Sequence, residues 1–124
     1  MSTALRDVAS AALAAAGLYP DTKTSSPTGP AIDMISADGP CFAVQVVGDY
    51  AADAVAGRIE QSADGSTGWA AISGADFASV TGANNIQVIR FERTMRYVRY
   101  AATITGGSPS VKMAAVIGEQ KKTI

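Results

Sequence analysis

Histidine is absent from this 124-residue chain, and cysteine occurs once, as Cys41. Zinc sites, histidine general bases, Ser-His-Asp triads and disulfide frameworks therefore lack the residues from which they are built. Cys41 lies in the apolar run 41–47, where we interpret it as a small buried hydrophobe. The glycines at 106 and 107 lack the lysine and the following helix of a phosphate-binding loop. We expect no enzyme, no cofactor and no metal site.

Long apolar runs are also missing. No stretch approaches the roughly 20 apolar residues that a membrane-spanning helix requires. The Ala-rich segment 8–16 differs from a signal peptide, because alanine is weakly hydrophobic and Asp7 interrupts the charged region before it. We therefore predict a soluble protein of a reducing compartment that makes no membrane contact.

Charge is unevenly distributed, although the net charge is only −1. Residues 1–85 contain three Lys or Arg and nine Asp or Glu, whereas residues 86–124 contain seven and two. Pairing within the fold or between subunits explains this split more simply than nucleic-acid binding, which usually requires a net basic domain. We expect no nucleic-acid partner.

Turn signals recur from residue 31 onward at the spacing of an all-β domain. The strands that we expect span 31–35, 41–47, 55–62, 69–72, 76–80, 86–91, 95–105 and 110–120. Alternation along 41–47 places Phe42, Val44 and Val46 on one face, which we expect to enter the core. The last strand is apolar on both sides, so it is central or its second face meets a partner. These features predict a two-sheet, jelly-roll-like or immunoglobulin-like β-sandwich of about eight strands.

Residues 1–30 are expected to form an N-terminal arm and linker, and residues 31–124 the sandwich domain. The Ala-rich segment 3–16 predicts a short helix capped by Ser2 or Thr3. Its apolar face is too thin to be stable alone, so we expect an arm that orders against another surface. Residues 17–20 end this segment, and residues 21–30 form a polar linker with two prolines.

Four arginines recur at every third position, at Arg90, Arg93, Arg96 and Arg99. A period of three fits no strand face, so the four must be divided between a turn and two strands. Two interpretations remain for the inner pair, Arg96 and Arg99. Their guanidiniums bind carboxylates of a neighbouring molecule, or they pair with groups of the same chain. Internal pairing would use one of three acids and the ring of one of two tyrosines: Glu60, Glu92 or Asp76, and Tyr97 or Tyr100. We favour the internal use.

The segment 59–69 indicates a strand, an Asp-Gly turn and a second strand, with Trp69 as a large anchor on the return. It also partly matches the Asp-box of sialidase propellers. Ser62, Asp64 and Trp69 fit that motif, but Ser66 stands where its glycine should be. A single imperfect copy favours the plain hairpin.

The order and spacing of these segments resemble the small head decoration (cement) proteins of tailed bacteriophages. The resemblance covers residues 31–120 and is carried by 32–34, 42–47, 59–72, 86–91, 96–106 and the final apolar strand up to Gly118. It implies a structural, jelly-roll-like β-sandwich, made in the host cytoplasm, that binds the outer surface of an HK97-type phage head. Such a protein stabilises contacts between capsomers as a homo-oligomer, a dimer or trimer on a symmetry axis.

In that interpretation the major capsid protein is the partner. The expected capsid or subunit contacts are apolar residues of the arm and basic groups elsewhere: Leu5, Leu13, Leu18, Tyr19, Arg90, Arg93, Lys121 and Lys122. The residues expected to have a structural role are Trp69, Arg96, Tyr97 and Arg99.

Two alternatives stay open. Residues 96–99, Arg-Tyr-Val-Arg, are also similar to the late strand of discoidin-type carbohydrate-binding sandwiches. A carbohydrate-binding module would use Trp69 and a tyrosine as a stacking platform. A phage tail or baseplate sandwich protein would differ from a head decoration protein only in its partner.

Overall fold

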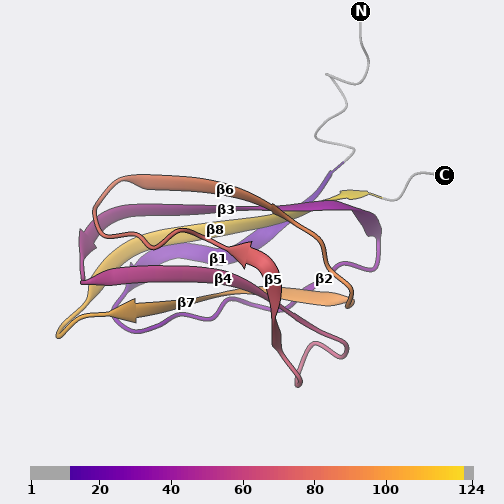
Figure 1. Ribbon diagram of the computed structural model, residues 1–124, viewed down its shortest axis with the longest axis horizontal. Coiled ribbons are helices and arrows are strands. Elements are labelled where there is room, and N and C mark those ends of the chain that lie inside the picture. Colours follow the sequence, from indigo (N-terminus) through magenta and orange to yellow (C-terminus); the bar gives the residue numbers. More distant parts are fainter. Residues whose placement is uncertain (1–11, 122–124) are drawn as a thin grey trace, which may run out of the picture.

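The chain forms a sandwich of two antiparallel four-stranded sheets in a computed structural model that describes residues 12–121 (Figure 1). One sheet has the order β1-β8-β3-β6 and the other the order β2-β7-β4-β5. The strands are β1 (Ala12–Lys23), β2 (Ile32–Asp33), β3 (Ala37–Ala51), β4 (Ala54–Ser62), β5 (Ala70–Asp76), β6 (Asn85–Phe91), β7 (Tyr97–Thr105) and β8 (Ser110–Lys121). The predicted all-β, two-sheet sandwich of eight strands is confirmed.

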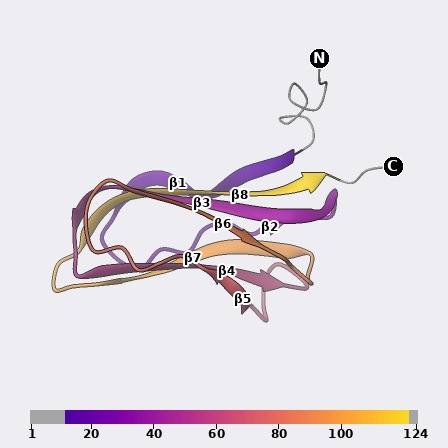
Figure 2. The same cartoon turned by 45° about the horizontal axis from the view of Figure 1, so that its top comes forward.

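Strand β8 lies in the middle of its sheet, between β1 and β3. Its inward side chains, such as Val111 and Ile117, are fully buried between the sheets, and its outward side chains include the exposed Val116. Figure 2 shows the two sheets stacked on each other, with β1, β8, β3 and β6 in one layer. The central position of β8 therefore explains the apolar residues on its inward side, which face the second sheet. It does not explain the apolar Val116 on its outward side, which faces away from that sheet.

Residues 12–30 belong to the sandwich rather than to an arm. Strand β1 pairs with β8 along its length, and Leu18 lies in the core. The next segment lies along β7, where the N–H of Ala102 donates to the carbonyl of Pro27 at 3.0 Å. The boundary expected at residue 30 is therefore wrong, and so is the helix over the part of 3–16 that the structure describes. Pairing with β8 overrides the helical preference of the alanines. Residues 1–11 lie outside the described residues.

The face of β3 that enters the core is the opposite of the one expected. Cys41, Ala43, Gln45 and Val47 point inward and are buried, whereas Phe42, Val44 and Val46 lie on the outer face. Inside, the hydroxyl of Tyr100 donates to Oε1 of Gln45. A Cβ at position 57 would collide with that same oxygen, so a glycine is required there. The core has a polar bond at its centre, which hydrophobicity alone does not predict.

Strand β5 replaces the two short strands expected at 69–72 and 76–80. It pairs with β4, and the register shifts between Arg58, opposite Asp76, and Glu60, opposite Ala71. The Ser73-Gly74 pair that suggested a turn lies in this irregular stretch, where Gly74 has φ +81°. The glycine therefore serves a bulge within one strand instead of ending it.

Candidate functional site

A cluster of charged residues lies on the outer face of the β2-β7-β4-β5 sheet. Nε of Arg99 donates to Glu60 at 2.8 Å, and Nε of Arg58 donates to the other oxygen of Glu60 at 3.0 Å. Burial alone would raise the pKa of Glu60, but the two arginine bonds outweigh it and hold the pKa below its ordinary value. One carboxylate between two guanidiniums leaves this cluster with one excess positive charge.

Trp69 completes this surface from the residue just before β5. The guanidinium carbon of Arg99 lies 4.3 Å from the centroid of the Trp69 ring, in cation–π geometry. The indole is partly exposed and does not belong to the core cluster. Because Glu60 holds Arg99 and Arg99 covers the ring, the indole has a fixed orientation on the surface.

The turn before Trp69 is closed by Asp64. Its carboxylate accepts bonds from the backbone N–H of Thr67 at 2.8 Å and of Ser66 at 2.9 Å. The bond from the Thr67 backbone is the largest cause that lowers the pKa of Asp64, far below its ordinary value. Ser62 contributes further bonds, including one to the carbonyl of Thr67. The hairpin predicted over 59–69 is present, and its acid holds the turn instead of facing a ligand.

Arg96 and Tyr97 form a second pair at the start of β7. Arg96 donates two bonds to Asp33, at 2.9 and 2.7 Å, and its guanidinium carbon lies 5.1 Å from the Tyr97 ring centroid. These bonds from Arg96 lower the pKa of Asp33. The other inner arginine, Arg99, pairs with Glu60. Both contacts are internal, as favoured, but the partner of Arg96 is none of the three acids expected: Asp33 lies 63 residues away in sequence.

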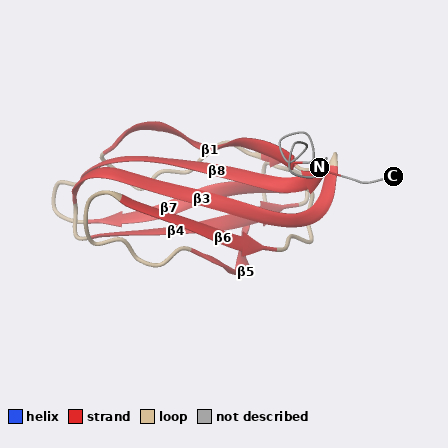
Figure 3. Cartoon of the chain, turned by 90° about the horizontal axis from the view of Figure 1, so that it is seen from above, coloured by secondary structure: helices blue, strands red, loops and turns tan. Residues whose placement is uncertain are grey.

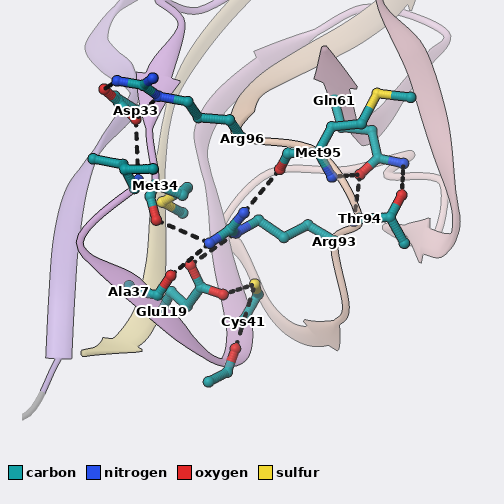
Figure 4. Close-up of polar contacts among 12 residues, drawn as sticks. Asp33, Met34, Ala37, Cys41, Gln61, Arg93, Thr94, Met95, Arg96 and Glu119 are labelled. Carbon is teal, nitrogen blue, oxygen red and sulfur yellow. Dashed lines mark hydrogen bonds and ion pairs between the residues drawn. The ribbon is translucent and has the colours of Figure 1, made fainter. Parts of the chain in front are cut away.

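Arg93 is engaged inside the chain instead of facing a partner. It donates to Glu119 at 2.9 Å and to the carbonyls of Met34, Ala37 and Met95 at 2.9, 2.6 and 2.9 Å (Figure 4). Glu119 is only 2% exposed. Arg93 therefore ties its own β6–β7 connection to the β2–β3 connection and to β8 at one end of the sandwich, so its guanidinium has internal partners where a contact with another molecule was expected.

Cys41 borders the same ion pair. Its thiol lies 3.2 Å from the second oxygen of Glu119, as Figure 4 shows. Burial, together with the neighbouring carboxylate, raises the pKa of this thiol to about 12. The thiol therefore stays protonated near neutral pH and is a poor nucleophile.

The other expected contact residues lie in different environments. Leu18 is buried in the core, and the partly buried Leu13 packs against that core. Tyr19 is 67% exposed in the irregular part of β1. Arg90 and Lys121 are exposed, and they lie at the end of the sheet where β1 begins. Leu5 and Lys122 lie outside the described residues.

A surface that the sequence indicated only through the two-sided apolar pattern of the last strand covers the outer face of the other sheet. It consists of β-branched aliphatic side chains on three neighbouring strands, and we call it the aliphatic face: Val44, Val46, Ile86, Val88 and Val116. Ile86 and Val88 are 69% and 66% exposed. Val44 pairs with Val88 on one side and with Val116 on the other, so these side chains form a continuous patch.

Two polar contacts explain why β6 turns its valine and isoleucine outward. The side chain of Gln87, which points to the other side of β6, donates to the carbonyl of Ala78 at 2.9 Å and accepts from its N–H at 2.8 Å. Through these two bonds, the side chain of Gln87 pairs with the backbone of Ala78 in the way that a residue of a neighbouring strand would. The alternation Ile-Gln-Val was visible in the sequence, but the inward position of the glutamine was not.

Within residues 12–121, no group of three or more His, Cys, Asp or Glu side chains could hold a metal ion. In the same part of the chain, no helix is long and apolar enough to cross a membrane.

No family model and no curated protein matches this chain. Among solved structures, the chain is similar to the xylan-binding domain from CBM 22, formally the x6b domain. The TM-score is 0.51 and the sequence identity 11%, over 92% of this chain and 89% of that domain. At this identity the similarity concerns the fold, a β-sandwich.

Proposed function

We propose that this protein is a non-catalytic binding module that holds a carbohydrate on the outer face of the β2-β7-β4-β5 sheet. The observation that carries the proposal is Trp69, whose partly exposed indole lies outside the core and is held in place by Arg99. The similarity to a xylan-binding domain supports this choice of ligand class, since it shows a sandwich of this shape in a protein named for sugar binding.

The surface around Trp69 combines the two kinds of contact that sugars make. An indole offers a flat apolar surface for the C–H face of a sugar ring, and nearby polar groups bond its hydroxyls. Arg58 and Arg99 supply donors, and the buried Glu60, bonded through both oxygens, holds the two guanidiniums in place. Because these side chains already hold each other, binding orders few of them, which lowers its entropic cost.

Binding of soluble xylan and of a panel of other glycans, measured by titration calorimetry, tests this proposal. We expect saturable binding by the wild-type chain and at least a tenfold weaker affinity in Trp69→Ala, about the loss of one stacked ring. Tyr19→Ala is the matched control, since it removes an aromatic side chain that is exposed on the other sheet. Absence of binding to every glycan by the wild-type chain would refute the proposal.

A second candidate is a phage head decoration protein, as the sequence resemblance implies. The observation that favours it is where the first and last described strands begin and end. Strand β1 begins and β8 ends at the same end of the sandwich (Figure 1), and the exposed Arg90 and Lys121 lie there. Exposed basic side chains at this end suit attachment to an acidic protein lattice, where many copies multiply a weak contact. A tail or baseplate protein would attach in the same way.

Decoration of isolated phage heads by purified protein tests this candidate. Deletion of residues 1–11 is the appropriate truncation, because a longer one would remove part of β1 and the buried Leu18. We expect a folded protein with reduced occupancy on the heads, and a further reduction in Arg90→Glu with Lys121→Glu. Unchanged occupancy in both variants would exclude attachment through this end.

A further inference from the structure

The aliphatic face has no cover within the described part of the chain. Figure 3 looks onto the sheet formed by β1, β8, β3 and β6, and no other described strand lies over it. Soluble monomers rarely expose such continuous apolar surface, and larger patches with a polar rim usually mark sites of protein association. The exposure of Ile86 and Val88 is therefore a feature that needs a partner.

The chemistry of the face restricts what that partner is. The side chains of this face carry no hydrogen-bonding groups, so their partner must offer an apolar surface. Ala114, beside Val46, continues the face into a shallow groove of about 360 Å³ that also includes Pro20 and Lys112. Charge lies at the rim of the face: Lys112 lies 3.3 Å from Asp49 beside the groove, and the exposed Arg90 follows Val88 on the same side of β6.

A second copy of the same chain offers such a surface. A two-fold interface uses the same patch on both subunits, and an uncharged aliphatic patch is compatible with itself. Two sheets pack face to face at about 10 Å, the arrangement already present inside this sandwich.

The size of the sheet agrees with a dimer interface. Four strands at about 4.8 Å spacing and about 11 residues at 3.3 Å give an outer face of roughly 700 Å². Stable protein interfaces bury about 800 Å² on each partner, with an apolar centre and a polar rim. The aliphatic face provides the centre, and the outer residues of β1 and the ends of β3 provide the rim.

We propose that two copies of this chain associate through the outer faces of their β1-β8-β3-β6 sheets, with the aliphatic face at the centre of the interface. This association is independent of the carbohydrate surface, which lies on the opposite sheet. The two sugar-binding surfaces of the dimer then point away from each other.

Sedimentation equilibrium of the full chain, up to about 0.5 mM, tests the proposal. We expect a monomer–dimer equilibrium with a dissociation constant in the micromolar range, the weak end for an interface of this size. Val88→Lys brings like charges into the aliphatic face at the edge strand β6 and is expected to raise that constant at least about tenfold. Val116→Lys, on the other side of Val44, is expected to act in the same direction. Ala56→Lys, at an exposed position of β4 on the opposite sheet, is the matched control.

Each result separates the possibilities. Dimers that dissociate in Val88→Lys and Val116→Lys but persist in Ala56→Lys support the proposal, provided that the variants unfold like the wild-type protein. A wild-type chain that stays monomeric throughout overturns it and leaves the face to a different molecule. Dimers that persist in both aliphatic-face variants, or that only Ala56→Lys disrupts, place the contact elsewhere and also overturn it. Glycan binding by Trp69→Ala is measured separately, so the two proposals fail independently.

Discussion

Replacement of Arg93 by methionine tests whether one guanidinium holds the end of the sandwich together. Methionine keeps much of the apolar stem but has no donor. The substitution would leave the carboxylate of Glu119 without its cation, and the carbonyls of Met34, Ala37 and Met95 without the bonds that Arg93 supplies.

The loss of free energy of unfolding follows from the burial of Glu119, which is 2% exposed. Removing one partner of a buried ion pair costs about 3–5 kcal/mol, because the remaining charge stays in a poorly solvated site. The carbonyls add less, since the Arg93 side chain is 15% exposed and water can reach its position. We expect a loss of about 4 kcal/mol, a large part of the 5–15 kcal/mol that stabilises a typical domain. The thermal midpoint would fall by roughly 15 °C.

Urea unfolding, followed by the fluorescence of Trp69 and by circular dichroism, measures this loss. Arg90→Met is the matched control, because Arg90 is exposed and should change stability by less than about 0.5 kcal/mol. The double variant Arg93→Met with Glu119→Gln should recover part of the loss, since it removes the orphaned charge. A loss below about 1 kcal/mol in Arg93→Met would refute the reasoning.

Three further predictions concern groups that the core or a turn holds. Tyr100→Phe leaves Gln45 without its bond and should cost about 1–3 kcal/mol in urea unfolding, whereas adding Gln45→Leu should restore most of it. Cys41 should react with a thiol reagent at pH 8 only after urea unfolds the chain, because its pKa is about 12; fast labelling of the native protein would contradict this. The pKa values of Asp64 and Glu60 lie below their ordinary values of 3.8 and 4.5, so the unfolded chain binds protons first. Stability should therefore be constant between about pH 5 and pH 8 and fall as the pH drops through 4, and Asp64→Asn should flatten the fall.

The candidate carbohydrate surface was only partly predictable. Trp69 stands out in the sequence because it is the only tryptophan and follows an Asp-Gly turn. Glu60 was one of three acids considered for the inner arginines, and its pairing with Arg99 depends on the register of β4 against β7. Arg93 and Glu119 are 26 residues apart, and no local pattern links them. Pairs across strands depend on register, which tertiary packing sets.

Local signals in the sequence determined the fold class. Turn residues at regular spacing and β-branched runs required an all-β protein of about eight strands, because each of these effects acts within a few residues. Alternation, however, states only that neighbouring side chains take opposite faces, and does not say which face enters the core. Tertiary structure decided that: Gln45 bonds to Tyr100 and Gln87 to Ala78, which turns Val44, Val46, Ile86 and Val88 outward. It also recruited residues 12–23 as a strand, because β8 offered them an edge to pair with almost a hundred residues later.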